Sequence, residues 1–295
     1  MSRFAALRGT AKSSAAGIVM AALVCAGVAL YATSATHAAA GAGAIPNLSP
    51  NDGTGWVPDR IAGDDFLPPP SGPGPVVSQK DHPYVPNNVG QSTFRVAELS
   101  NPILKPWAVE RMKTVNDAVL AGKVPFTPRE RCWPGGVPVY DIYERDRPIF
   151  FVQTPQRITI ISEHDQQIRH IYMNVPHSKN LKPSWYGESV GHYEGDTLVV
   201  DTIGLNDKTF VDNYRTPHTT ALHVVERFRE LDGGKTLEAL ITIEDPGAFN
   251  MKWSAVQRWT RRENRPIIEL ICAENPNNYF NLDLVPIPSS SKSDF

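Results

Sequence analysis

The second half of the chain alternates apolar and polar residues with a period of two, which is typical of half-buried β-strands. Short runs rich in Val, Ile, Thr and aromatic residues are separated by turn signals. Two of these turns, Glu194-Gly195-Asp196 and Asp232-Gly233-Gly234, are tight enough for hairpins. The expected strands are Ile149–Gln153, Arg157–Ser162, Ile168–Met173, Ser189–Tyr193, Thr197–Thr202, Leu222–Glu230, Thr236–Glu244, Trp253–Thr260 and Ile267–Cys272.

The pattern shows no alternation of strands with helices and no repeat of fixed period. A succession of short strands of this kind predicts a mainly β fold, an antiparallel barrel or curled sheet that is lipocalin-like by analogy. One packed N-terminal helix is expected over residues 106–121, where apolar residues recur at spacings of three and four. Pro106 suits the first helical position, and Gly122 suits the position just after the helix.

Residues 41–95 predict a proline-rich arm or spacer rather than a core. Ten of the 26 prolines lie between Pro46 and Pro86. Because proline lacks an N–H and fixes φ, this segment should be extended or irregular. Its aromatic residues Trp56, Phe66 and Tyr84 could anchor it to a β-rich globular domain at residues 96–288, which a disordered tail at 289–295 would follow.

The first forty residues have the layout of a secretory signal peptide. Arg3, Arg8 and Lys12 precede an apolar run from about residue 17 to 31, and Ala38-Ala39-Ala40 supplies small residues for cleavage. The alternative is a permanent anchor, but the run is shorter than the ~20 residues that span a bilayer. We therefore expect a periplasmic or secreted protein with no stable membrane insertion after cleavage.

The charge of the mature chain disfavours nucleic acid as a partner. The whole chain has 29 Lys and Arg residues against 31 Asp and Glu residues, and the signal segment removes three basic residues and no acidic one. A mildly acidic protein has no basic excess with which to neutralise phosphates. The expected partner is a small organic molecule.

Two cysteines remain after signal cleavage, Cys132 and Cys272. In an oxidising compartment, a single pair predicts one disulfide bond. A reactive thiol or a metal-ligand pair is the alternative.

Candidate chemistry is densest between His177 and Arg227, which hold four of the eight histidines. In the expected strands, His223 and Arg227 share one face, and Asp201 lies on the neighbouring strand. If these faces line a barrel interior, His223 would act as acid or base, Asp201 would orient it, and Arg227 or Tyr186 would hold an oxygen of the ligand. These four are the candidate catalytic residues.

Further candidates and two rejected motifs come from the same region. Residues 218, 223 and 226 have the spacing of zinc ligands, but a strand places His223 and Glu226 on opposite faces, so no metal is expected. Residues 187–191 spell G-x-S-x-G, yet strands flank them, whereas the nucleophile motif requires a strand-to-helix turn. The sequence carries no cofactor motif, so no cofactor is expected. The candidate ligand-binding residues are Trp185, His218, His192 and Trp253.

The chain resembles a widespread group of secreted bacterial proteins with no established shared activity. The resemblance covers about residues 100–280 and implies export and a β domain, but no catalytic residue. It rests on Ser184–Gly187, Gly195–Thr202, Pro217-His218, Leu222–Arg227, Asp245-Pro246 and Cys272–Asn275.

Two function classes follow from these residues. One is an exported non-redox enzyme, a lyase, isomerase or hydrolase, that acts on a small, partly apolar molecule through His-centred acid–base chemistry. The other is a small-ligand-binding protein that uses the same residues as polar anchors. A purely structural envelope protein is the third, weaker alternative.

Overall fold

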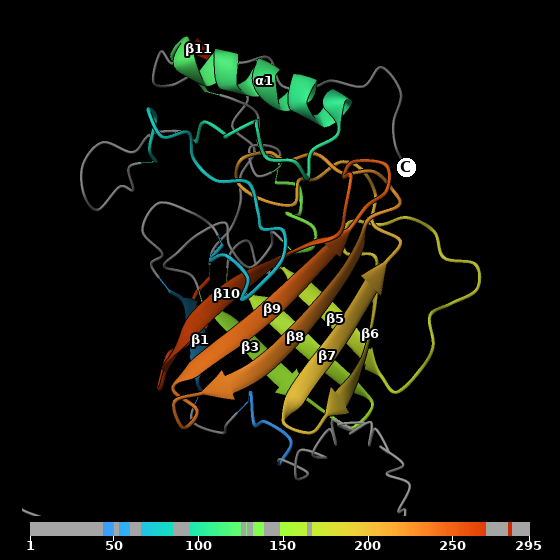
Figure 1. Ribbon diagram of the computed structural model, residues 1–295. Helices are drawn as coiled ribbons and strands as arrows, with labels where there is room; N and C mark the ends of the chain where they lie inside the picture. Colours follow the sequence, from blue (N-terminus) through green and yellow to red (C-terminus); the bar gives the residue numbers. More distant parts are fainter. Residues whose placement is uncertain are drawn as a thin grey trace, which may run out of the picture. The chain divides into compact units, whose positions relative to one another are not determined.

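The computed structural model describes residues 44–49, 53–59, 66–84, 95–124, 128, 132–138, 148–163, 167–269 and 283–284. The chain divides into Met1–Ala39 and Ala40–Phe295, and all described residues belong to the second unit. This unit is mainly β, as the sequence predicts, and α1 is its one described helix (Figure 1). The elements are β1 (Gly55–Pro58), α1 (Pro106–Leu120), β2 (Lys123–Val124), β3 (Ile149–Gln153), β4 (Arg157–Ser162), β5 (Ile168–Met173), β6 (Glu188–Glu194), β7 (Thr197–Ile203), β8 (His223–Leu231), β9 (Thr236–Glu244), β10 (Trp253–Arg262) and β11 (Asp283–Leu284).

Nine strands form one closed barrel in the order β1-β10-β9-β8-β7-β6-β5-β4-β3. The predicted barrel is therefore confirmed, but the expectation of purely antiparallel pairing is wrong at one place. Strands β5 and β6 run parallel, with Ile171 opposite Ser189. Parallel neighbours need a connection that returns along the sheet. Residues 174–187 make this connection, and we call them the crossover segment.

The barrel closes through β1, which comes from the proline-rich segment. β1 pairs antiparallel with β10, and Trp56 stands opposite Ile149 of β3. The sequence predicts an irregular backbone here and a ninth strand at 267–272. Residues 265–269 instead form no strand, and 270–272 lie outside the described residues. Proline is confined to the end of β1, so its ladder hydrogen bonds can still form.

The expected anchors of the proline-rich segment are confirmed for two residues that are almost fully buried, Trp56 and Phe66. The indole of Trp56 donates a hydrogen bond to the carbonyl of Leu48 at 2.9 Å. Tyr84 lies under the Arg95 guanidinium, whose Cζ is 3.9 Å from the ring centroid. The described parts of this segment therefore contribute to the barrel wall and core.

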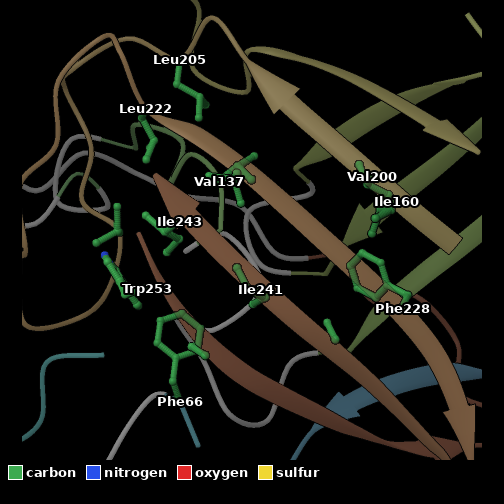
Figure 2. Close-up of a cluster of buried hydrophobic side chains, with 14 of the residues drawn as sticks. Phe66, Val137, Ile160, Val200, Leu205, Leu222, Phe228, Ile241, Ile243 and Trp253 are labelled. Carbon is green, nitrogen blue, oxygen red and sulfur yellow. The ribbon is translucent and has the colours of Figure 1, made fainter. Parts of the chain in front are cut away.

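A core of buried apolar side chains lines the inside of the barrel and includes residues from the loops (Figure 2). Inward-facing residues such as Ile160, Val200 and Phe228 alternate with outward-facing ones along their strands. Val137, Leu205 and Leu222 add apolar side chains from the loops to the same cluster. This packing fixes which face of each strand is in contact with water.

Helix α1 confirms the predicted helix and packs beside the loop that joins β9 to β10. The indole N–H of Trp107, in its first turn, donates a hydrogen bond to the carbonyl of Gly247 at 2.8 Å. Asn116 on its buried side bonds both the N–H and the C=O of Ala97, each at 2.9 Å. The helix is thereby tied to both the barrel loops and the segment that precedes it.

Candidate functional site

The candidate acid–base residues lie on the outer wall of the barrel, not in its interior. Along β8, Val224, Glu226 and Phe228 are buried inward, while His223, Val225 and Arg227 alternate with them and are half-buried. On β7, Asp201 likewise faces outward, between buried Val200 and Thr202. The convergence inside a closed lumen that the sequence analysis considered is therefore wrong.

His223 and Asp201 nevertheless meet. Asp201 stands opposite Val225, so His223 is its diagonal neighbour on the same face. The Nε2 atom of His223 is 3.0 Å from Oδ1 of Asp201, and 35 % and 38 % of the two side chains are exposed. We call this pair the Asp201–His223 dyad.

The dyad shifts the proton affinities of both its members. The hydrogen bond from His223 lowers the pKa of Asp201, against the opposing effect of burial, and a hydrogen bond from His177 adds to the decrease. The hydrogen bond to Asp201 raises the pKa of His223, although burial alone would lower it. The charged pair of an Asp201 carboxylate and a protonated His223 therefore persists over a wider pH range than it would if both groups had their ordinary pKa values.

A second histidine, His177 of the crossover segment, binds the same carboxylate. Its Nε2 atom is 2.9 Å from Oδ1 of Asp201, and its Nδ1 atom is 3.1 Å from Oε1 of Glu188. Glu188 also accepts hydrogen bonds from the backbone N–H of Ser178 at 2.7 Å and from its hydroxyl at 2.6 Å. The Ser178 hydroxyl is the main cause of the lowered pKa of Glu188.

Neither His177 nor Glu188 was among the predicted site residues. His177 belongs to the histidine-rich region that the sequence singled out, but it lies in a segment without periodicity. Its position depends on the parallel pairing of β5 with β6, which sends the crossover segment back across the sheet. Only a prediction of that pairing could have placed His177 beside β7.

Arg227 does not join the dyad. Its Nη2 atom is 2.5 Å from Oε2 of Glu194, and His192 contacts the other oxygen of Glu194 at 3.1 Å. By register, Val199 lies between His192 and Arg227. The three polar side chains bridge over β7, which accounts for the 5 % exposure of the outward-facing Val199.

Tyr186 and Trp185 are held by other partners. The hydroxyl of Tyr186 donates to Oε1 of Gln167 at 2.8 Å. The ring of Trp185 lies 5.3 Å from that of Trp133, measured between centroids. These contacts fasten the end of the crossover segment to Gln167, just before β5, and to Trp133.

His218 and Trp253 are buried within the fold. His218 has a lowered pKa because of its burial. Its Nε2 is 2.9 Å from the Thr209 hydroxyl, and its Nδ1 is 3.1 Å from the carbonyl of Thr219. Trp253 packs edge-on against Phe249, with ring centroids 5.6 Å apart. Neither side chain shares the outer wall with the dyad.

The barrel interior holds a separate ionic network. Arg169 of β5 binds both carboxylate oxygens of Glu226 at 3.1 and 2.5 Å. Its Nε and Nη2 atoms also donate to the hydroxyls of Ser189 and Thr202, at 3.0 and 2.8 Å. Glu226 thus faces opposite to His223, which confirms the alternation that argued against a zinc site. Within the described ranges, no group of three or more His, Cys, Asp or Glu side chains is arranged to hold a metal ion.

The disulfide and the signal segment stay predictions, because Cys272 and residues 1–43 lie outside the described residues. No described helix is long and apolar enough to cross a membrane. No protein-family model and no curated protein matches the chain.

Proposed function

We propose that the protein is an exported non-redox enzyme that uses the Asp201–His223 dyad for acid–base chemistry on a small, partly apolar organic molecule. The observation that carries this proposal is the contact between His223 and Asp201 on a half-exposed face. A carboxylate that holds one nitrogen of an imidazole fixes its tautomer and orientation. The other nitrogen is then available to a ligand.

In His223 that other nitrogen is Nδ1. It has no hydrogen-bond partner within the described part of the chain, whereas Nε2 is bonded to Asp201. In neutral His223, Nε2–H donates to Asp201 and the Nδ1 lone pair can take a proton. In protonated His223, Nδ1–H can return it. This cycle serves lyase, isomerase and hydrolase reactions and needs no electron carrier.

The surroundings of the dyad suit a partly apolar substrate. Val190 and Val225 are the register partners of Asp201 on its two sides, so both share its outer face. Both are half-buried and offer apolar contact beside the polar pair. A ligand that places a polar group at Nδ1 of His223 would lay its apolar part across these valines.

The test is a turnover screen of the mature protein against small esters, lactones, hydroxy acids and enolisable ketones. With any substrate that turns over, His223→Gln and Asp201→Asn should each reduce kcat/KM by about 100-fold or more. His170→Gln is the matched control, because it alters an exposed histidine of β5 that contacts Thr159 and that is not among the candidate site residues. Full activity in His223→Gln would refute the proposal.

A second candidate function, small-ligand binding without catalysis, is supported by strand β10. The indole nitrogens of Trp253 and Trp259 and Oε1 of Gln257 are buried and lack hydrogen-bond partners in the described structure. All three residues belong to the inward-facing set of β10, and buried polar groups normally have partners. Native mass spectrometry of the mature protein, purified from its own compartment, would detect a retained organic molecule. Loss of this molecule from the double variant Gln257→Leu with Trp259→Phe would favour the binding function.

A further inference from the structure

The crossover segment is fastened along the outer wall at both of its ends. At its start, the N–H of Asn174 donates to the carbonyl of Gly191 at 2.7 Å. Near its end, the backbone of Ser184 bonds the carbonyl of Gly204 at 2.9 Å and the N–H of Asn206 at 2.8 Å. Gly204 has φ +71°, and a Cβ there would clash with Leu181 of the segment. The segment is thus fitted to the barrel and delivers His177 in one place.

His177 stands between two carboxylates, with one facing each ring nitrogen. Both contacts are hydrogen bonds only when both nitrogens carry a proton. Glu188 is itself fixed by two hydrogen bonds from Ser178, so it cannot turn away without losing them. His177 therefore has no free nitrogen for a ligand, which distinguishes it from His223.

The two imidazoles meet at a single atom. Oδ1 of Asp201 is 2.9 Å from Nε2 of His177 and 3.0 Å from Nε2 of His223. Two donors at one oxygen compete for its electron density, so each hydrogen bond is weaker than it would be alone. The presence of His177 therefore acts on His223 through Asp201.

We propose that His177 is a positioning residue that holds Asp201 and limits the strength of its bond to His223, thereby setting the pH range in which His223 exchanges protons. This inference rests on the proposed function, in which His223 is the acid–base group. It assigns no contact between His177 and the substrate. Glu188 is the anchor that keeps His177 in place.

The charged groups around the two histidines set the sign of the expected effect. His177 faces Glu188 of β6 and Asp201 of β7. His223 faces Asp201 and is also influenced by Glu244 of β9, which raises its pKa, and by Lys252, which lowers it. Removal of His177 leaves the other groups in place and gives Oδ1 of Asp201 to His223 alone. The stronger hydrogen bond to this carboxylate raises the pKa of His223.

The experiment is an NMR titration of the His223 ring nitrogens in the mature protein. In His177→Ala the pKa of His223 should rise by about half a unit or more, because a competing donor to Oδ1 of Asp201 is lost. His177→Gln keeps an uncharged donor for Asp201, so its value should fall between wild type and His177→Ala. His170→Gln, which alters an exposed histidine of β5, should leave the pKa of His223 unchanged. A thermal melt of each variant confirms that it is folded.

An unchanged or lowered pKa of His223 in folded His177→Ala or His177→Gln overturns the inference. This readout requires no turnover, so it is separate from the test of the proposed function. If the pKa rises but His223→Gln retains full activity, the coupling stands and the enzymatic role fails. If His223→Gln abolishes activity while His177 variants leave the pKa unchanged, only the positioning role fails.

Discussion

Strands β7 and β8 carry two polar networks, one on each face, and the two differ in how completely their hydrogen bonds are used. Inside the barrel, Arg169 and Glu226 are 1 % exposed, and their ion pair is completed by Ser189 and Thr202. On the outer wall, Asp201 binds two histidines, but Nδ1 of His223 has no partner in the described residues. A buried ion pair that also receives hydrogen bonds from its neighbours is typical of a structural role. A ring nitrogen without a partner at a half-exposed site is available for acid–base chemistry.

The largest expected effect comes from breaking the interior pair. Glu226→Ala leaves the Arg169 guanidinium buried without its counter-ion and should lower the free energy of unfolding by about 3–5 kcal/mol. Urea unfolding followed by fluorescence measures this loss. The double variant Arg169→Met with Glu226→Leu removes both charges and should recover most of the stability. If Glu226→Ala were as stable as wild type, the interior ion pair would not have the structural role assigned to it.

A smaller effect with a distinct pH dependence is expected from Asp201→Asn. The lowered pKa of Asp201 contributes stability above about pH 3.9, the unfolded value, and loses it as pH falls through the folded value. The raised pKa of His223 contributes stability below about pH 6.5 and loses it as pH rises through the folded value. Because both groups are more than one-third exposed, the total should stay below about 1 kcal/mol.

Urea midpoints of wild type and Asp201→Asn, measured from pH 4 to pH 9, test this dependence. The difference between them should be largest between about pH 4 and pH 6.5 and should shrink at higher pH, as His223 loses its proton. A difference that stays constant over this range would show that the dyad does not titrate as the structure indicates.

The smallest expected effect is that of Arg227→Ala. Its ion pair with Glu194 is 38 % and 48 % exposed, so its loss should cost less than about 1 kcal/mol. Part of that cost is the exposure of Val199, which the bridge covers. Arg229→Ala, which removes another exposed outer-wall arginine, is the matched control. If Arg227→Ala lowered the free energy of unfolding as much as Glu226→Ala does, the two faces would not differ in the way proposed.

The parts of the fold that follow from local pattern could be predicted from the sequence. Alternation placed β3 to β10 to within about two residues, and spacing, Pro106 and Gly122 placed α1. The same alternation put His223 and Glu226 on opposite faces, but it could not say which face was inside. That choice depends on how the whole sheet curls.

The parts that depend on long-range pairing could not be predicted. β1 lies among prolines, and its role as a barrel strand is visible only once its partners β10 and β3 are known. The parallel pairing of β5 with β6 likewise determines where His177 lies. Half of the outer-wall network was therefore missing from the sequence prediction, and Arg227 was assigned to the wrong group because its partner Glu194 is fixed by register.

Closure of the barrel by β1 has a consequence for how the protein folds. In this pairing Gly55 meets Arg262, so the seam joins residues from nearly opposite ends of the described chain. Contacts of such high sequence separation form slowly, because a long loop must be ordered before they do. Until β10 is in place, β1 has no sheet to complete and β9 presents an unpaired edge that can join another chain. Aggregation during refolding should therefore be governed by the lifetime of this open barrel, and substitutions in the β1–β10 seam should affect the yield of folded protein more than the stability of the finished one.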